Sequence, residues 1–228
     1  MSTTLDSDSL YRLMAWLSPA YPTGAFSYSH GIEYAIEAKL VTDRASLVDW
    51  IAWILRRGAG QVDAVLLIAA YQAAHDPAAL DDVATLAAAL RGSAEAALES
   101  AQQGHAFLAT TRAAWPEKRL DTFAARWGER ALALPVAVAL ACVDRVPLDL
   151  ALRAYLQSFG ANLVSAGVRL IPLGQTDGQI AIAALAAAVD ESAEAALATP
   201  LEEIGSAAPM VDWTSMRHET QYTRLFRS

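Results

Sequence analysis

The sequence contains little cysteine, little lysine and little charge of either sign. Its 228 residues include one cysteine, Cys142, and two lysines, Lys39 and Lys118, and charged residues make up 18% of the chain. A single cysteine excludes a disulfide scaffold, and 12 glycines exclude a collagen-like chain. Cys142 lies in the apolar run ALPVAVALACV, which predicts an inert buried thiol rather than a nucleophile and fits a reducing compartment.

Basic surface and long apolar segments are also scarce. A formal net charge of -8 argues against a protein that binds the phosphate backbone of nucleic acids. Residues 1–9 are polar and acidic, unlike the basic start of a signal peptide. The apolar run of residues 131–143 is shorter than the roughly 18 residues of a membrane-spanning helix, and Pro135 interrupts it. We therefore expect a cytoplasmic protein with neither a membrane nor a nucleic acid as partner.

Alanine and other apolar residues dominate the rest of the chain. Alanine accounts for 50 residues, and 54% of the chain is hydrophobic, which excludes a disordered protein. Alanine is the best helix former, and alternating β-branched runs typical of strands are absent. The spacing of Leu10, Leu13, Met14 and Leu17 is that of one helix face. The sequence thus predicts an all-α fold, with about ten helices packed as a single domain.

Helix boundaries follow from prolines, glycines and capping residues. Asp8 or Ser9, Thr42 and Thr176 are expected N-caps, and Pro147 is expected in a first helical turn. The expected helices span about residues 9–17, 29–39, 42–57, 61–75, 78–91, 93–114, 117–127, 129–144, 147–170 and 176–198. Because the last twenty residues lose regular periodicity, we expect a helical domain of residues 1–209 followed by an extended interaction tail of residues 210–228.

Motifs of known chemistry are mostly absent. The chain has no G-x-x-x-x-G-K-[ST] phosphate cradle, no C-x-x-C pair and no H-E-x-x-H. His218 and Glu219 begin like the zinc motif, but Tyr222 stands at the position of its second histidine. No two of the four histidines are spaced as ligands on one helical turn, so His218 is only a weak metal candidate. Two alternatives stay open: a small helical enzyme that uses Ser27, His30 and Glu33, and a weak nickel-binding chaperone.

Three segments are richer in polar and aromatic residues than helix packing requires. Residues 22–33 form an early loop with aromatics, hydroxyls and two glycines, although a capped helix connection would explain them as well. Residues 162–179 carry a polar stripe, which predicts a solvated face, a buried network or a docking surface. Residues 217–228 hold three arginines, a tyrosine and a phenylalanine, residue types that are enriched at protein interfaces. A frayed terminus is the alternative for this last segment.

Together these segments resemble the UreF family of urease accessory proteins. The resemblance rests on SPAYPTGAFSYSHGIE, NLVSAGVRLIPLGQTDGQ and HETQYTRLFRS, in this order and at these separations. It implies an all-α, dimeric protein that is not an enzyme and helps to build the dinuclear nickel centre of urease. Such a protein bridges the accessory protein UreD (also called UreH) to the GTPase UreG on the urease apoprotein. GTP hydrolysis by UreG is coupled to nickel delivery, and the family member regulates that GTPase.

The resemblance also implies which residues bind partners. It places no catalytic residue and no cofactor on this chain, because nickel and GTP are handled by the partners. The tail from Arg217 onward is expected to fold onto the UreD-type partner and to become ordered there. Because lysine is nearly absent, any lysine contact of the family must be made here by arginine. The implied partner-binding residues are Pro22, Gly24, Phe26, Ser27, Tyr28, Glu33, Arg169, Pro172, Gly174, Gln175, Gly178, Glu219, Tyr222, Arg224, Leu225 and Phe226.

Overall fold

Helices account for all regular structure in residues 5–228, the part of the chain that this computed structural model describes. The expectation of a single all-α domain is confirmed for these residues, and the first four residues of the polar N-terminal stretch lie outside them. In chain order the elements are α1 (Ser7–Trp16), η1 (Ala25–Ser27), α2 (Ile32–Glu37), α3 (Arg44–Arg57), α4 (Ala59–Ala73), α5 (Pro77–Ala89), α6 (Ala94–Ala114), α7 (Lys118–Trp127), α8 (Leu134–Cys142), α9 (Leu148–Leu170), α10 (Gln175–Ala184), α11 (Ala186–Ala198), η2 (Leu201–Glu203) and α12 (Pro209–His218).

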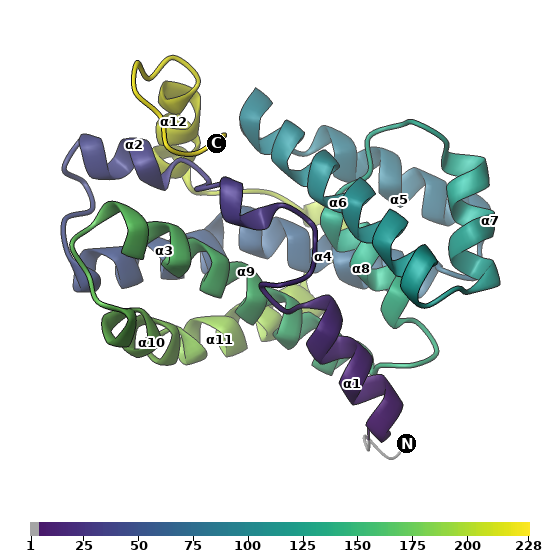
Figure 1. The fold of residues 1–228 in the computed structure, drawn as a ribbon. Helices are drawn as coiled ribbons and strands as arrows, with labels where there is room; N and C mark the ends of the chain where they lie inside the picture. Colours follow the sequence, from purple (N-terminus) through teal and green to yellow (C-terminus); the bar gives the residue numbers. More distant parts are fainter. Residues whose placement is uncertain (1–4) are drawn as a thin grey trace.

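The core is built around α4 and α8. Every residue of α8 from Pro135 to Cys142 is buried, as expected for a helix that is apolar on all sides. Helix α4 packs against α8, and Figure 1 shows α3, α9, α10 and α11 on one side of α4 and α5 to α8 on the other. Cys142 is fully buried, as expected, and burial raises the pKa of its thiol to about 12. Within residues 5–228, each helix is too short or too polar to cross a bilayer.

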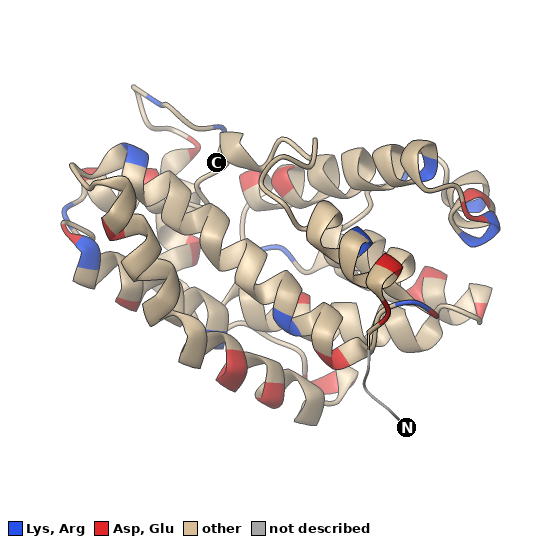
Figure 2. Ribbon diagram, turned by 60° about the horizontal axis from the view of Figure 1, so that its bottom comes forward, with Lys and Arg blue, Asp and Glu red and all other residues tan. Residues whose placement is uncertain are grey.

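Charged residues are sparse and lie mainly on the outer helices (Figure 2). Helix α11 carries only acidic charges, Asp190, Glu191 and Glu194. Two arginines, Arg56 of α3 and Arg153 of α9, pair with all three, with Arg56 Nε 2.6 Å from Glu191 Oε2. The excess of acidic residues therefore lies in the helical body, where arginines neutralise the negative charge only in part.

Several helix boundaries differ from those expected. Asp6 caps α1 by accepting a hydrogen bond from the amide N of Ser9 at 2.9 Å, and Asp43 caps α3 in the same way. The carboxylate of an N-cap aspartate accepts a hydrogen bond from the amide of the third helical residue. Asp6 is therefore the N-cap of α1, where Asp8 or Ser9 was expected, and Asp43 is the N-cap of α3, where Thr42 was expected. The helix expected over 176–198 begins one residue earlier and is divided at Leu185, whose backbone keeps a helical conformation. No glycine or proline marks that division in the sequence.

The expectation that the last twenty residues lack a regular element is wrong for residues 209–218. These residues form α12, which has Pro209 in its first turn and begins where the boundary between domain and tail was expected. The buried face of α12 is mostly polar, with Thr214, Ser215 and His218 beside a single apolar residue, Val211, so it leaves no apolar stripe in the sequence. Residues 219–228, here called the C-terminal segment, then turn back toward α2, η1 and the start of α6 (Figure 1).

Candidate partner interface

The three unusual segments of the sequence meet at one end of the molecule. Asn162 of α9 donates a hydrogen bond from Nδ2 to the carbonyl oxygen of Ala25 at 3.2 Å. Two helical turns further towards the end of α9, Arg169 Nη2 donates to the carbonyl oxygen of Phe26 at 2.5 Å. The guanidinium of Arg169 also lies 4.2 Å from the ring centroid of Phe226. The polar stripe of α9 therefore connects the early loop to the C-terminal segment.

The early loop turns its aromatic side chains in opposite directions. Gly24 has a φ of 77° and precedes the short helix η1, whose Phe26 is 67% exposed. Tyr28 is buried, and its hydroxyl donates to Gln102 of α6. Pro22 is exposed. The helix expected from residue 29 begins only at Ile32, because His30 and Gly31 both adopt a positive φ, at 56° and 78°.

Backbone hydrogen bonds attach the C-terminal segment to this loop. The amide N of Arg227 donates to the carbonyl oxygen of Ser27 at 2.8 Å, and the amide N of Ser29 donates to the carbonyl oxygen of Ser228 at 2.9 Å. Phe226 is buried between these contacts, whereas Leu225 points outward and is 64% exposed. The segment thus lies along the loop like a short added strand, although residues 5–228 contain no assigned strand.

Acidic side chains of α2 and α6 hold the other side of the C-terminal segment. The Glu33 carboxylate accepts hydrogen bonds from the amides of Leu225 at 2.6 Å and Phe226 at 2.9 Å. Arg224 Nη1 lies 2.8 Å from Glu95 Oε1. Glu219 accepts a hydrogen bond at 3.0 Å from the amide N of Ala94, at the N-terminus of α6. Of the residues implied in this segment, Tyr222 alone is fully exposed.

His218 is buried between two carboxylates. Its Nε2 is 3.1 Å from Glu33 Oε2, and its Nδ1 is 2.6 Å from Glu95 Oε2. Both ring nitrogens are therefore engaged within the chain, which argues against His218 as a metal ligand. Across residues 5–228, the structure contains no group of three histidine, cysteine or acidic side chains arranged to hold a metal ion.

The remaining implied residues lie at the turn between α9 and α10. Pro172, Gly174 and Gln175 are exposed, while Gly178 is buried against Val168. Asp177 in this turn pairs with Arg44 of α3. Among residues 5–228, no hydrogen bond joins these positions to the C-terminal segment. The structure therefore brings Arg169 into contact with that segment, but not the turn that follows Arg169.

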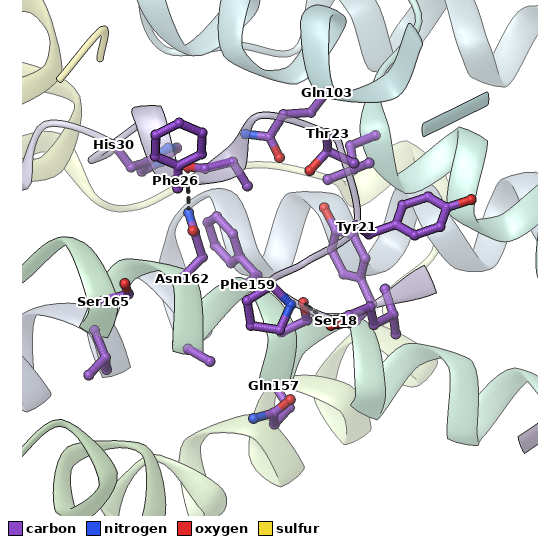
Figure 3. A pocket seen from close by; sticks show the side chains of 18 of the residues that line it. Ser18, Tyr21, Thr23, Phe26, His30, Gln103, Gln157, Phe159, Asn162 and Ser165 are labelled. Atoms are coloured by element: carbon purple, nitrogen blue, oxygen red, sulfur yellow. Dashed lines mark hydrogen bonds between the residues drawn. The ribbon is translucent and has the colours of Figure 1, made fainter. Parts of the chain in front are cut away.

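A cavity of about 590 Å³ opens beside η1, between α1, α6, α9 and α10. In Figure 3 the side chains of His30 and Gln103 lie on one side of it, and those of Phe159 and Asn162 on the other. Burial opposes a charge on His30, but the Glu99 carboxylate, 3.6 Å from Nδ1, outweighs burial and raises the pKa of His30.

The inner wall of this cavity contains a buried ion pair that sequence reasoning missed. Asp63 Oδ1 lies 2.7 Å from Arg91 Nη1, and both side chains are only 8% exposed. Tyr155 donates a hydrogen bond to Asp63 Oδ2 at 2.6 Å. Burial and the neighbouring Asp63 raise the pKa of Tyr155 well above its usual value, so its hydroxyl remains a donor. The signal available in the sequence was a single aspartate within the otherwise uncharged helix α4.

The geometry does not support the enzyme alternative. The carboxylate of Glu33 is occupied by the C-terminal segment and by His218. The ring of His30 faces Glu99 rather than Ser27. A nucleophile needs a base within hydrogen-bond reach and a third group to orient that base, and these three residues are not arranged in that way.

Comparison with known proteins identifies the same family as the three unusual segments of the sequence. The family described as UreF matches residues 41–186. A urease accessory protein UreF of Granulibacter bethesdensis is 55% identical over 100% of this chain and 97% of its own length. The corresponding protein of Rhodopseudomonas palustris strain HaA2 is 53% identical over 96% of this chain and 94% of its own. The corresponding protein of Bradyrhizobium diazoefficiens is 48% identical over 98% of this chain and 93% of its own length. This chain therefore belongs to the UreF family of urease accessory proteins.

Proposed function

We propose that this protein is a non-catalytic scaffold that bridges a UreD/UreH-type protein and the GTPase UreG during assembly of the nickel metallocentre of urease. In this proposal it also regulates GTP hydrolysis by UreG, binds no cofactor itself and acts in the cytoplasm as a homodimer on the urease apoprotein. Family membership supports the urease connection. The dimer and the docking on the apoprotein rest on the family resemblance alone.

The observation that carries the proposal is a set of exposed apolar side chains on a fixed backbone. Phe26 is held through its carbonyl oxygen by Arg169, and Leu225 is held through its amide by Glu33, yet both side chains point outward. Tyr222 is fully exposed nearby in the sequence. Aromatic and large apolar side chains that are rigidly presented are typical anchors of protein interfaces. The surface formed by Phe26, Tyr222, Arg224 and Leu225, here called the presenting surface, suits a protein partner.

The partner assignment is tested by truncating the two anchors of the C-terminal segment. We expect the double variant Tyr222→Ala, Leu225→Ala to bind the UreD-type protein at least about tenfold more weakly, since interface anchors each contribute on the order of 2 kcal/mol. Affinity is measured by titration calorimetry with the purified partner. Leu197→Ala on α11 is the matched control, because Leu197 is also a half-exposed leucine and lies outside the presenting surface. Equal affinity of wild type and double variant would refute the assignment of this surface.

Arg169 tests how the protein acts on the GTPase. An arginine that reaches into the GTPase site contributes roughly a 10³–10⁵-fold acceleration. In this structure Arg169 already donates to the carbonyl oxygen of Phe26 and covers the ring of Phe226. We therefore expect Arg169→Ala to change GTP turnover in the assembled complex by less than about tenfold, and to act mainly by releasing Phe26.

Turnover is measured with the complex preassembled at saturating concentrations, so that weaker assembly does not enter the rate. Arg169→Lys serves as the comparison, because it keeps the positive charge and loses the planar fork that spans two acceptors. A loss of a thousandfold or more in Arg169→Ala, with the complex intact, would contradict a structural role and assign Arg169 to the GTPase site.

A further inference from the structure

We infer that Glu33 is a positioning residue, which holds the presenting surface in shape through a set of alternating charges, buried except for Arg224, and does not itself touch the partner. This set, here called the tail clamp, consists of Glu33, His218, Glu95 and Arg224. The inference rests on the proposed function, in which the C-terminal segment docks on a partner. It changes the role that the family resemblance implied for Glu33, from contact residue to internal support.

Glu33 is placed to shape the backbone of the C-terminal segment. Its side chain is 8% exposed, so little of it remains for a partner to touch. Oε1 accepts from the amide of Leu225, and Oε2 accepts from the amide of Phe226. Two consecutive amides that point at one carboxylate fix the peptide between them, and hydrogen bonds to a charged acceptor are about twice as strong as neutral ones. Because successive side chains then project to opposite sides, Leu225 faces outward when Phe226 is buried.

The hydrogen-bond partners of His218 suit a tail clamp of alternating charges. A neutral imidazole donates from one ring nitrogen and accepts at the other. Here each ring nitrogen faces a carboxylate oxygen, at 3.1 Å and 2.6 Å, and an ionised carboxylate can only accept. Only the imidazolium form donates to both Glu33 and Glu95. With Arg224 on the second oxygen of Glu95, the two negative charges of the clamp meet two positive ones, which is the condition under which buried charges are tolerated.

The tail clamp connects three separate helices of the chain. Glu33 belongs to α2, Glu95 to the first turn of α6 and His218 to the last turn of α12. The C-terminal segment starts directly after His218 and is bound again at Arg224 and Phe226. Tyr222 therefore sits in a short bridge between two fixed points. A segment whose shape is fixed before association loses less conformational entropy on binding, so Glu33 favours docking without contributing a contact itself.

The first test compares two glutamates of the same helix. Glu33→Gln keeps the size of the side chain but replaces one acceptor oxygen by an NH₂ group. This group cannot accept the hydrogen bonds that the oxygen accepted. Glu37→Gln is the matched control, since Glu37 is one turn further along α2, is exposed and also accepts a hydrogen bond from the C-terminal segment, from Gln221. We expect amide hydrogen exchange of residues 219–228 in the free full-length protein to be at least tenfold faster in Glu33→Gln and unchanged in Glu37→Gln.

Affinity for the UreD-type partner is then expected to fall at least tenfold in Glu33→Gln and to stay at the wild-type level in Glu37→Gln. Glu95→Gln, which weakens the other half of the clamp, provides a second variant if Glu33→Gln does not fold. Faster exchange together with unchanged affinity would overturn the positioning role. Unchanged exchange in both clamp variants would overturn the clamp itself.

A spectroscopic measurement reads the chemistry of the clamp directly. The chain has four histidines, and the ring ¹⁵N signals of His218 are assigned by their loss in His218→Gln. From the two carboxylate contacts of the ring we expect protons on both ring nitrogens of His218 in the wild type, and a proton on only one of them in Glu33→Gln. A neutral His218 ring in the wild type would contradict the alternating charges.

The outcomes separate this inference from the function on which it rests. If Tyr222→Ala, Leu225→Ala leaves partner affinity intact while Glu33→Gln still accelerates exchange of residues 219–228, the proposed docking surface is wrong and the clamp remains. If the double variant loses affinity while Glu33→Gln does not, the docking surface is right and the positioning role of Glu33 is wrong.

Discussion

Replacing Arg91 by methionine is expected to lower the free energy of unfolding by about 3–5 kcal/mol, the usual cost of leaving one partner of a buried ion pair alone. Arg91 and Asp63 are both only 8% exposed, and methionine keeps much of the apolar stem of the arginine. Asp63 would retain only the hydroxyl of Tyr155 as a donor at its second oxygen. For a chain of this length the midpoint of thermal unfolding should fall by roughly 6–20 °C. Calorimetry and urea unfolding both measure this change.

An exposed ion pair of the same kind is the control. Arg56 pairs with Glu191 at 2.6 Å, with side chains 39% and 60% exposed, and exposed pairs typically contribute at most about 1 kcal/mol. Arg56→Met should therefore leave the unfolding midpoint nearly unchanged. If Arg91→Met proved as mild as Arg56→Met, the buried pair would make no net contribution to stability, and its presence beside the cavity would need another explanation.

Replacing Gly31 by alanine is expected to detach α12 and the C-terminal segment and to weaken partner binding on the order of a hundredfold, or about 3 kcal/mol. Gly31 has a φ of 78°, a conformation that costs an L-residue roughly 1–2 kcal/mol. In addition, a Cβ at this position would lie 2.7 Å from the amide N and 3.0 Å from the Cα of Ser215, in the middle of α12. Helix α12 must therefore move, and His218 moves with it. Hydrogen exchange of residues 209–228 and affinity for the UreD-type protein measure the two effects.

Gly24 provides the comparison for Gly31. Its φ of 77° is nearly the same, but a Cβ at Gly24 would meet no atom within 4 Å. Gly24→Ala therefore carries the backbone cost without the collision. If both variants loosened α12 equally, backbone strain in the loop would explain the effect, and the close approach of α2 and α12 would not.

The helices that the sequence predicted well are those with strong local signals at both ends. The expected spans 93–114 and 117–127 became α6 and α7, which begin at Ala94 and Lys118. Ser93 caps the first of these through its hydroxyl, and prolines or glycines separate the neighbouring helices. Such signals depend on residues within one or two turns, so a single sequence contains them in full.

The contacts that build the candidate interface have no local signal. Glu33 and Phe226 are 193 positions apart, and Arg169 and Phe26 are 143 apart. Composition marked the three segments as unusual and the family resemblance linked them, but neither indicated which side chains would be buried. Glu95, Glu99, Asp63 and Arg91 escaped notice because a charged residue in a predicted helix normally faces solvent. Only the fold shows that Asp63 pairs with Arg91, and that Glu95 and Glu99 face His218 and Ser228.

The hydrogen bond from the amide of Ser29 to the carbonyl oxygen of Ser228 has a consequence for when the presenting surface forms during translation. Residues 224–228 are synthesised after all twelve helices of residues 5–228, and yet they complete the site that starts at residue 22. The last member of the buried hydrophobic core cluster is Val211, so residues 224–228 contribute nothing to that cluster. Without these residues, however, the chain cannot present Leu225 or bury Phe226. Docking through this surface therefore requires residues 224–228 to be folded back onto the early loop.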